Sequence, residues 1–230
     1  MNDPTSDTLQ TALARHQLGL PDDQVAQLDR YCHLLWEWNE KLNLTRHTDY
    51  EKFASRDVLD CVQLSRLLEP GEEVLDVGSG GGVPGIILAI VRPDLQVSLS
   101  ESIGKKAQVL DTIAQELDLS TPIYHSRAED VLEDFPFDAL IARAVGPLWK
   151  MCTWFEPHWH CFGRLLAIKG PRWVEERREA RQRGLMHHVN LRKAAVYPMP
   201  GTASESVILK LWAKRPDDPH AGSLEEGDEV

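Results

Sequence analysis

The chain has 230 residues, of which 42% are hydrophobic and 27% are charged, and its formal charge is −11. This composition is typical of a globular protein and excludes collagen-like and wholly disordered chains. The longest aliphatic run, residues 86–91, is far shorter than the roughly 20 residues of a membrane-spanning helix. The first residues show no secretion signal, and the four cysteines form no CxxC pair. We therefore expect a cytoplasmic protein with reduced thiols and no membrane partner.

Hydrophobic periodicity predicts two helices, and strand–helix alternation follows them. Residues 1–20 show no sustained pattern, and we expect a flexible N-terminus there. A helical cap is expected over residues 21–69, with one long helix after Pro21 and a second from Arg56 to Leu68. The polar, acidic tail 216–230 is predicted to be disordered.

Residues 70–215 are expected to form the main domain. Short apolar runs predict strands at 73–77, 96–100, 122–124, 137–142 and 164–168, with helices between them at 85–91, 105–117, 148–159 and 173–183. Two last strands, 191–197 and 206–212, have no helix between them, which predicts an antiparallel hairpin at the edge. The fold class is therefore α/β, with a doubly wound, mostly parallel sheet.

A glycine cluster follows the first strand. Asp76 ends an apolar run, and Gly78, Gly80 and Gly82 turn the chain into a helix. Glycine allows positive φ and close approach of a ligand, and open sheets bind ligands at the carboxyl ends of their strands. Asp76 is expected near a positive group of the ligand, such as the ammonium of a methionine moiety. Glu101 ends the second strand, where a carboxylate can accept hydrogen bonds from both ribose hydroxyls.

Several stretches in this order resemble the glucose-inhibited division protein B family of small-subunit rRNA methyltransferase G enzymes. They are residues 35–45, 56–60, 76–85, 101–106, 126–129, 142–144 and 167–170. The resemblance implies a Rossmann-like class I methyltransferase that uses S-adenosyl-L-methionine. It also implies that the product is 7-methylguanine in the decoding-region loop of 16S rRNA, so that 16S rRNA or the small ribosomal subunit is the partner.

The resemblance also implies roles for single residues. Gly78 and Val83 would line the methionine and ribose side of the cofactor, and Glu101 would hold the ribose. Ala128 and Glu129 would border the adenine. Arg143 would lie where cofactor and substrate meet, and the RNA would be faced by Arg127, Arg143 and Lys169.

The chain departs from the family pattern at three places. Asp57 stands where the family usually has histidine, Cys61 replaces a common serine, and Ser204 lies where many members carry arginine. The first and third changes remove positive charge where RNA is expected to pass. They affect the expected RNA contacts more than the cofactor site.

The charge distribution removes an objection to RNA. Residues 216–230 contain six acids and no lysine or arginine, whereas residues 163–215 hold twelve basic residues against four acids. Guanine N7 carries no proton, so its methylation requires orientation and no general base. The catalytic residue is therefore open, with Arg143 as the best orienting candidate.

Two other functions remain as alternatives. Gly80, Gly82 and Gly85 fit the GxGxxG pattern of a dinucleotide site, which allows an NAD-type oxidoreductase. The second alternative is a methyltransferase-like protein that binds the cofactor or the ribosome without catalysis. The histidines and cysteines of residues 152–161 fit no standard zinc spacing, so no metal is expected. The sequence does not fix the oligomeric state, and we expect a monomer.

Overall fold

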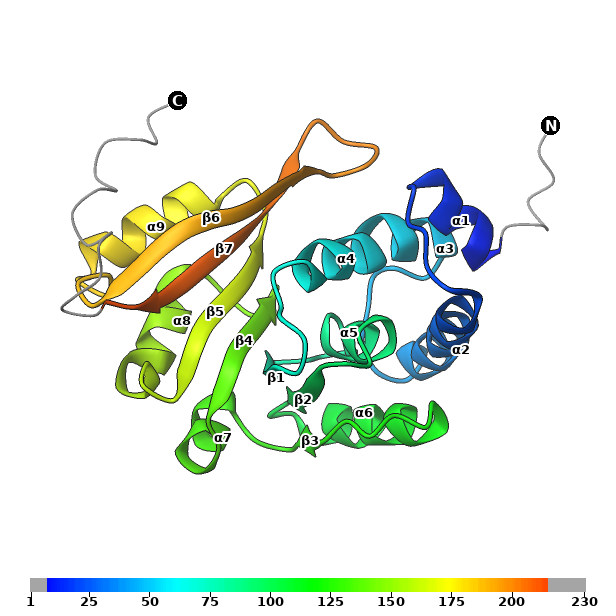
Figure 1. Cartoon of the computed structure of the whole chain (residues 1–230), viewed down its shortest axis with the longest axis horizontal. Coiled ribbons are helices and arrows are strands. Elements are labelled where there is room, and N and C mark those ends of the chain that lie inside the picture. The colour runs from blue at the N-terminus through cyan, green and yellow to red at the C-terminus, as the bar shows by residue number, and fades with distance from the viewer. Residues whose placement is uncertain (1–7, 215–230) are drawn as a thin grey trace.

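The computed structural model describes residues 8–214, which form a seven-stranded sheet with helices on both faces (Figure 1). The strand order is β3-β2-β1-β4-β5-β7-β6. The parallel strands are β1 (Glu73–Val77), β2 (Gln96–Ser100), β3 (Ile123–Tyr124), β4 (Phe137–Arg143) and β5 (Phe162–Lys169). The antiparallel pair β6 (Val189–Pro198) and β7 (Glu205–Ala213) ends the sheet. The predicted α/β, doubly wound fold is confirmed.

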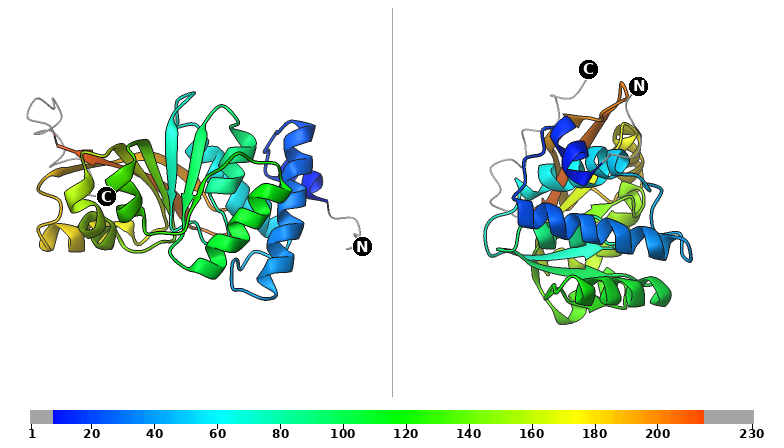
Figure 2. Two further views of the ribbon diagram at one scale, coloured as in Figure 1. Left: turned by 90° about the horizontal axis from the view of Figure 1, so that it is seen from below. Right: turned by 90° about the vertical axis from the view of Figure 1, so that its right-hand side faces the viewer.

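The sheet divides the core into two hydrophobic clusters. Alternate side chains of a strand point to opposite faces, so Val74 joins one cluster and Leu75 joins the other. The first face is covered by α2 (Asp22–Asn39), α4 (Leu59–Ser65), α5 (Gly85–Val91) and α6 (Gly104–Glu116). The second is covered by α7 (Ala128–Asp134), α8 (Leu148–Phe155) and α9 (Trp173–Gln182). Both layers can be followed in the two views of Figure 2.

The expectation of a flexible N-terminus over residues 1–20 is wrong for the part that the structure describes. Helix α1 (Leu9–Arg15) buries Leu9, Ala12 and Leu13 in the first cluster. The Thr8 hydroxyl caps this helix by accepting a hydrogen bond from the Thr11 amide at 3.2 Å. Residues 1–7 and the predicted disordered tail 216–230 lie outside the described residues. The division between 21–69 and 70–215 stays a prediction, and both parts contribute to the first cluster.

The helices differ from the sequence prediction more than the strands do. The second helix starts earlier, with α3 (Tyr50–Lys52) and a π-helical segment η2 (Phe53–Val58) before α4. Helix α8 ends at Phe155, because Pro157 cannot continue an α-helix. A short 3₁₀ turn, η3 (Glu156–His158), contains this proline. Helix α7 was not expected. Within residues 8–214, no helix is long and apolar enough to cross a membrane.

Candidate active site

The glycine loop follows β1, in the middle of the sheet. Gly78, Gly80 and Gly82 have φ values of 64°, 59° and 99°, in the left-handed region that favours glycine. A Cβ on Gly78 would lie 3.1 Å from Val145 Cγ1, which follows β4. The loop is therefore fixed in a shape that side chains at these positions would disturb.

Helix α2 contacts the glycine loop through a buried hydrogen bond. The buried Tyr31 hydroxyl donates a 2.8 Å hydrogen bond to the carbonyl of Gly81. A Cβ on Gly82 would lie 2.6 Å from Ile86 Cγ1 and 3.1 Å from that hydroxyl. The sequence placed Tyr31 only on the apolar face of its helix, and helical periodicity gives no sign of this contact. Gly78, Gly80 and Val83 keep accessible surface, whereas Gly82 is buried.

Asp76 has a different environment from the one expected. Its carboxylate is fully buried, and Oδ2 accepts a hydrogen bond of 3.0 Å from the Gly85 amide at the start of α5. Its other oxygen, Oδ1, has no partner among the described residues. Burial raises the pKa of Asp76 to about 7, against the lowering effect of the Gly85 hydrogen bond. In this structure Asp76 fixes the start of α5 and is not open to a ligand.

Glu101 lies beside the loop because β1 and β2 are neighbours. Its Oε2 accepts a hydrogen bond of 2.9 Å from the Gly80 amide, and its Oε1 accepts one of 2.8 Å from the Ile103 amide. A carboxylate has about four acceptor positions, so each oxygen keeps one for a ligand hydroxyl. The structure thus brings Glu101 and the glycine loop together, as the sequence predicted.

The next strand end contributes the start of α7. Arg127 is exposed and precedes the first residue of this helix. The Ala128 side chain is buried, and Glu129 is half-buried. Only Arg127 of these three presents most of its side chain to solvent, so it remains available to an anion.

Arg143 ends β4 between two buried carboxylates. Its Nη1 lies 2.7 Å from Asp57 Oδ1, and its Nε lies 2.8 Å from Asp60 Oδ2. Burial alone lowers the pKa of Arg143, but Asp57 and Asp60 outweigh burial and raise it above its ordinary value. The guanidinium is therefore held as a permanent cation by one carboxylate at Nη1 and another at Nε.

The same network includes two residues that the sequence did not single out. His47 Nδ1 lies 2.8 Å from Asp57 Oδ1, and the Tyr197 hydroxyl donates a 2.7 Å hydrogen bond to Asp60 Oδ1. The network joins the π-helical segment, α4, β4 and β6. Asp57 is 1% exposed, so this departure from the family pattern is an internal partner of Arg143 and removes no charge from the surface. Ser204 lies in the β6–β7 turn, where its carbonyl accepts from the Met199 amide at 2.9 Å.

Lys169 differs most from its expected role. It is 8% exposed, and its ammonium lies 2.9 Å from Glu176 Oε2 and also donates to the Gly146 carbonyl. Glu176 of α9 neutralises its charge, and because Lys169 also lines a cavity with Arg143 and Trp149, its expected contact with RNA stays a prediction. This ion pair holds α9 against the loop after β4.

A cavity of about 660 Å³ opens beside this network, at the carboxyl ends of β4 and β5. Ala144, which lines it, has φ of 56°, a backbone conformation that costs a residue with a Cβ roughly 1–2 kcal/mol. Trp149 and Met199 supply apolar surface, and the lining carries charges of both signs, from Arg143, Lys169, Arg172, Asp60, Glu175, Glu176 and Glu179. Such a hollow, with an aromatic ring and charged groups beside the glycine loop, suits a planar polar ligand.

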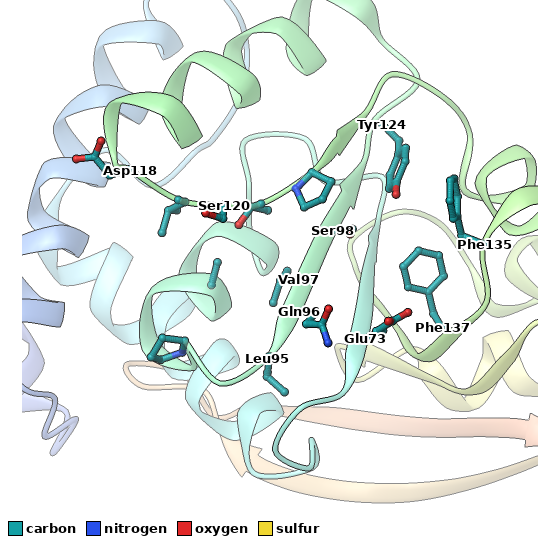
Figure 3. Close-up of a pocket in the computed structure, with 15 residues that line it drawn as sticks. Glu73, Leu95, Gln96, Val97, Ser98, Asp118, Ser120, Tyr124, Phe135 and Phe137 are labelled. Atoms are coloured by element: carbon teal, nitrogen blue, oxygen red, sulfur yellow. The ribbon is translucent and has the colours of Figure 1, made fainter.

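A second cavity, of about 560 Å³, lies away from the loop (Figure 3). It is lined by Glu73 and Gln96, the first residues of β1 and β2, together with Tyr124, Phe135 and Phe137. Ligands of open α/β sheets bind at the carboxyl ends of the strands, so this cavity is not part of the candidate site. Within the described chain, no cluster of three or more histidine, cysteine or acidic residues could hold a metal ion.

Solved structures share the fold at low sequence identity. A mutant of MtNAS in complex with S-adenosylmethionine superposes with a TM-score of 0.54 and 17% identity, over 90% of this chain and 84% of that chain. TrmN from Thermus thermophilus gives a TM-score of 0.50 and 20% identity, over 68% of this chain and 48% of that chain. These similarities concern the fold alone.

Sequence relatives are much closer. A protein of Rhodopirellula baltica named ribosomal RNA small subunit methyltransferase G is 50% identical over 217 residues, 94% of this chain and 92% of that protein. A protein of the same name in Streptococcus pneumoniae is 38% identical over 183 residues, 76% of this chain and 77% of that protein. The family described as rRNA small subunit methyltransferase G matches residues 24–198. The resemblance noted in the sequence is confirmed: the chain belongs to the rRNA small subunit methyltransferase G family, GidB.

Proposed function

We propose that this protein transfers the methyl group of S-adenosyl-L-methionine to N7 of a guanine in the decoding-region loop of 16S rRNA. The observation that carries the proposal is the glycine loop after β1 with Glu101 beside it, in a chain that belongs to this family. The partner is 16S rRNA or the small ribosomal subunit, which implies a cytoplasmic place of action.

The residues present fit the cofactor. Gly78 is exposed and has no side chain, so a ligand can approach its backbone closely. A Cβ at this position would press against Val145. Glu101 keeps acceptor positions for the two ribose hydroxyls. Asp76 supports the site indirectly, because its buried carboxylate fixes the start of α5 directly after the loop. When bound, the cofactor supplies a methyl group on a positively charged sulfur.

The chain's own part in this reaction is to orient the base. Guanine N7 attacks with a lone pair and has no proton to lose, so the reaction gains from alignment. In our proposal the cavity beside Arg143 holds the guanine, and Trp149, whose ring centroid lies 4.0 Å from Arg183 Cζ, lines its wall. Arg143 is a positioning residue, because Asp57 and Asp60 fix the direction in which its guanidinium points. Ala128 and Glu129 border the adenine side, and Arg127 faces the RNA.

An NAD-type oxidoreductase and a binding protein without catalysis are the competing functions. Titration calorimetry with S-adenosylhomocysteine and with NAD distinguishes the methyltransferase from an NAD-type oxidoreductase. We expect the chain to bind S-adenosylhomocysteine and not NAD. Binding of NAD alone would overturn the proposal. An assay of labelled methyl transfer to 16S rRNA, naked and within the small subunit, distinguishes the methyltransferase from a binding protein without catalysis. Cofactor binding with no transfer to either substrate would leave only a binding protein.

A further inference from the structure

Positive charge at the carboxyl ends of the sheet is largely neutralised within the protein. Asp57 and Asp60 hold Arg143, and Glu176 holds Lys169. A protein that binds RNA needs cations that can release counterions from phosphates. RNA binding therefore calls for basic side chains that no carboxylate neutralises.

Basic side chains gather on one face of the β5–β7–β6 end of the sheet, and among them Arg192 and Lys210 have no carboxylate partner within residues 8–214. Arg164 is on β5, Lys210 on β7 and Arg192 on β6, and Arg66 follows α4. These four residues line one cavity of about 460 Å³, which we call the basic cradle. Figure 1 shows α8 and α9 on one side of this end of the sheet and α4 on the other.

The cradle contains a like-charge pair on neighbouring strands. Arg192 and Lys210 are direct partners in the β6–β7 register. Both rest near the ring of Trp212, with Arg192 Cζ at 5.8 Å and Lys210 Nζ at 5.6 Å from its centroid. Within residues 8–214, neither forms an ion pair with a carboxylate, whereas Arg164 pairs with Glu72 at 2.7 Å.

This arrangement is unfavourable without a ligand. Like charges directly opposite each other destabilise an antiparallel pair. Burial, together with the charges of Arg192 and Arg164, lowers the pKa of Lys210. The folded chain thus maintains a repulsion that a bound anion would relieve. The acid in the cradle, Glu69, is exposed at its rim.

The cradle is connected to the candidate active site by one helix. Asp60, which contacts Arg143, lies in the first turn of α4, and Arg66 follows its last residue. A helix of seven residues is about 10 Å long. The β6 strand makes the same connection, because Tyr197 bonds Asp60 and Arg192 lines the cradle.

We propose that the basic cradle binds backbone phosphates of the RNA that carries the target guanine, as a docking surface separate from the methyl-transfer site. This inference rests on the proposed function for the identity of the RNA. The cradle sets how tightly and in which orientation the RNA binds, and it contributes nothing to the reacting atoms.

The test compares two double variants that lose the same charge. Arg192→Gln/Lys210→Gln removes the like-charge pair, and Arg30→Gln/Lys52→Gln removes two exposed cations on α2 and α3 as a control. Binding of a decoding-region fragment of 16S rRNA is measured at several salt concentrations. For the cradle variant we expect roughly tenfold weaker binding at about 0.1 M salt. We also expect the slope of log K against log salt to be smaller by about 1.4–1.8, because each phosphate contact contributes about 0.7–0.9.

Other readouts separate docking from folding and from catalysis. We expect the melting temperature of the cradle variant to be equal or higher, because a repulsion is removed, and its affinity for S-adenosylhomocysteine to be unchanged. With saturating RNA its turnover should match that of the wild-type chain, while KM for RNA rises. The single variant Arg192→Gln should show about half of the change in slope.

Three results would overturn the inference. The first is RNA binding by the cradle variant that equals that of the control variant. The second is a loss of RNA binding in the cradle variant that disappears when residues 216–230 are deleted, because the acidic tail would then be the occupant. The third is a loss of turnover at saturating RNA. If the wild-type chain binds RNA through the cradle but methylates no guanine N7, the proposed function fails and the cradle stands.

Discussion

Gly78 is the residue at which a single added carbon tests the cofactor site. Its φ of 64° is strained for any other residue, and the added Cβ would meet Val145. Both effects act on the backbone that borders the proposed cofactor. Gly71 is a matched control, because its φ is 82° and nothing lies within 4 Å of an added Cβ.

We expect Gly78→Ala and Gly71→Ala each to lower the free energy of unfolding by about 1–2 kcal/mol through backbone strain. Only Gly78→Ala should also weaken binding of S-adenosylhomocysteine, by tenfold or more, because its methyl group presses on Val145 and shifts the loop that borders the proposed cofactor site. Denaturant unfolding and calorimetry measure the two effects. Equal cofactor affinity in both variants would remove Gly78 from the site.

The substitution Arg143→Lys tests whether methyl transfer depends on the planar shape of the Arg143 guanidinium or only on its positive charge. Lysine keeps the charge but lacks the planar fork that reaches Asp57 and Asp60 together. We therefore expect Arg143→Lys to lower methyl transfer by at least about tenfold while cofactor affinity changes little. Arg92→Lys is the control, because Arg92 contacts Asp94 through Nε and Nη2 at 2.7 Å and lines no part of this cavity. Unchanged turnover in Arg143→Lys would show that Arg143 does not position the substrate.

Helix α1 is one of the two elements, with α7, that the sequence did not predict and that the structure packs into the core. Its apolar side chains, Leu9, Ala12 and Leu13, are few and stand near the end of the chain, so no periodicity is sustained. We expect Leu13→Ala to lower the free energy of unfolding by about 2–4 kcal/mol, as for other buried leucines.

The exposed neighbour Gln10 provides the comparison for α1. Gln10→Ala should change the free energy of unfolding by less than about 0.5 kcal/mol, because surface substitutions usually do. Denaturant unfolding of both variants tests the packing of α1. A small, equal change in the free energy of unfolding in the two variants would support the earlier expectation that the N-terminus is flexible.

The sheet and most helices could be predicted because their signals are local. Alternating apolar runs, glycines and prolines mark the strands and their ends within a few residues. Helix α7 escaped prediction because only Ala128, Val131 and Leu132 of its seven residues are buried. Two turns of helix are too short for a clear period.

The candidate site could be predicted only in part, for a similar reason. The glycine loop and Glu101 are recognisable because strand order brings their positions together. The network around Arg143 joins His47, Asp57, Asp60 and Tyr197 across up to about 150 positions of sequence, and no local pattern pairs them. The burial of Lys169 likewise depends on Glu176, which α9 brings back over the end of β5.

The whole molecule carries its charge unevenly. The formal charge is −11, yet residues 163–215 hold twelve basic residues against four acids. Six acids belong to residues 216–230, which lie outside the described residues. The net charge therefore gives a poor account of the surface that RNA would meet.

Deleting residues 216–230 should leave affinity for S-adenosylhomocysteine unchanged. RNA binding should become tighter at low salt and converge with that of the full chain at high salt, because repulsion between carboxylates and phosphates is screened. Salt-dependent binding of the decoding-region fragment measures this. Loss of cofactor binding on deletion would show that the tail belongs to the folded domain.

The most direct test of the proposed activity is the position of the transferred methyl group. The chain is incubated with labelled S-adenosyl-L-methionine and small-subunit RNA, naked and assembled, and the labelled base is mapped. We expect the label at N7 of one guanine in the decoding-region loop of 16S rRNA. Label at another atom or another base, or no label with either substrate, would contradict the proposed function.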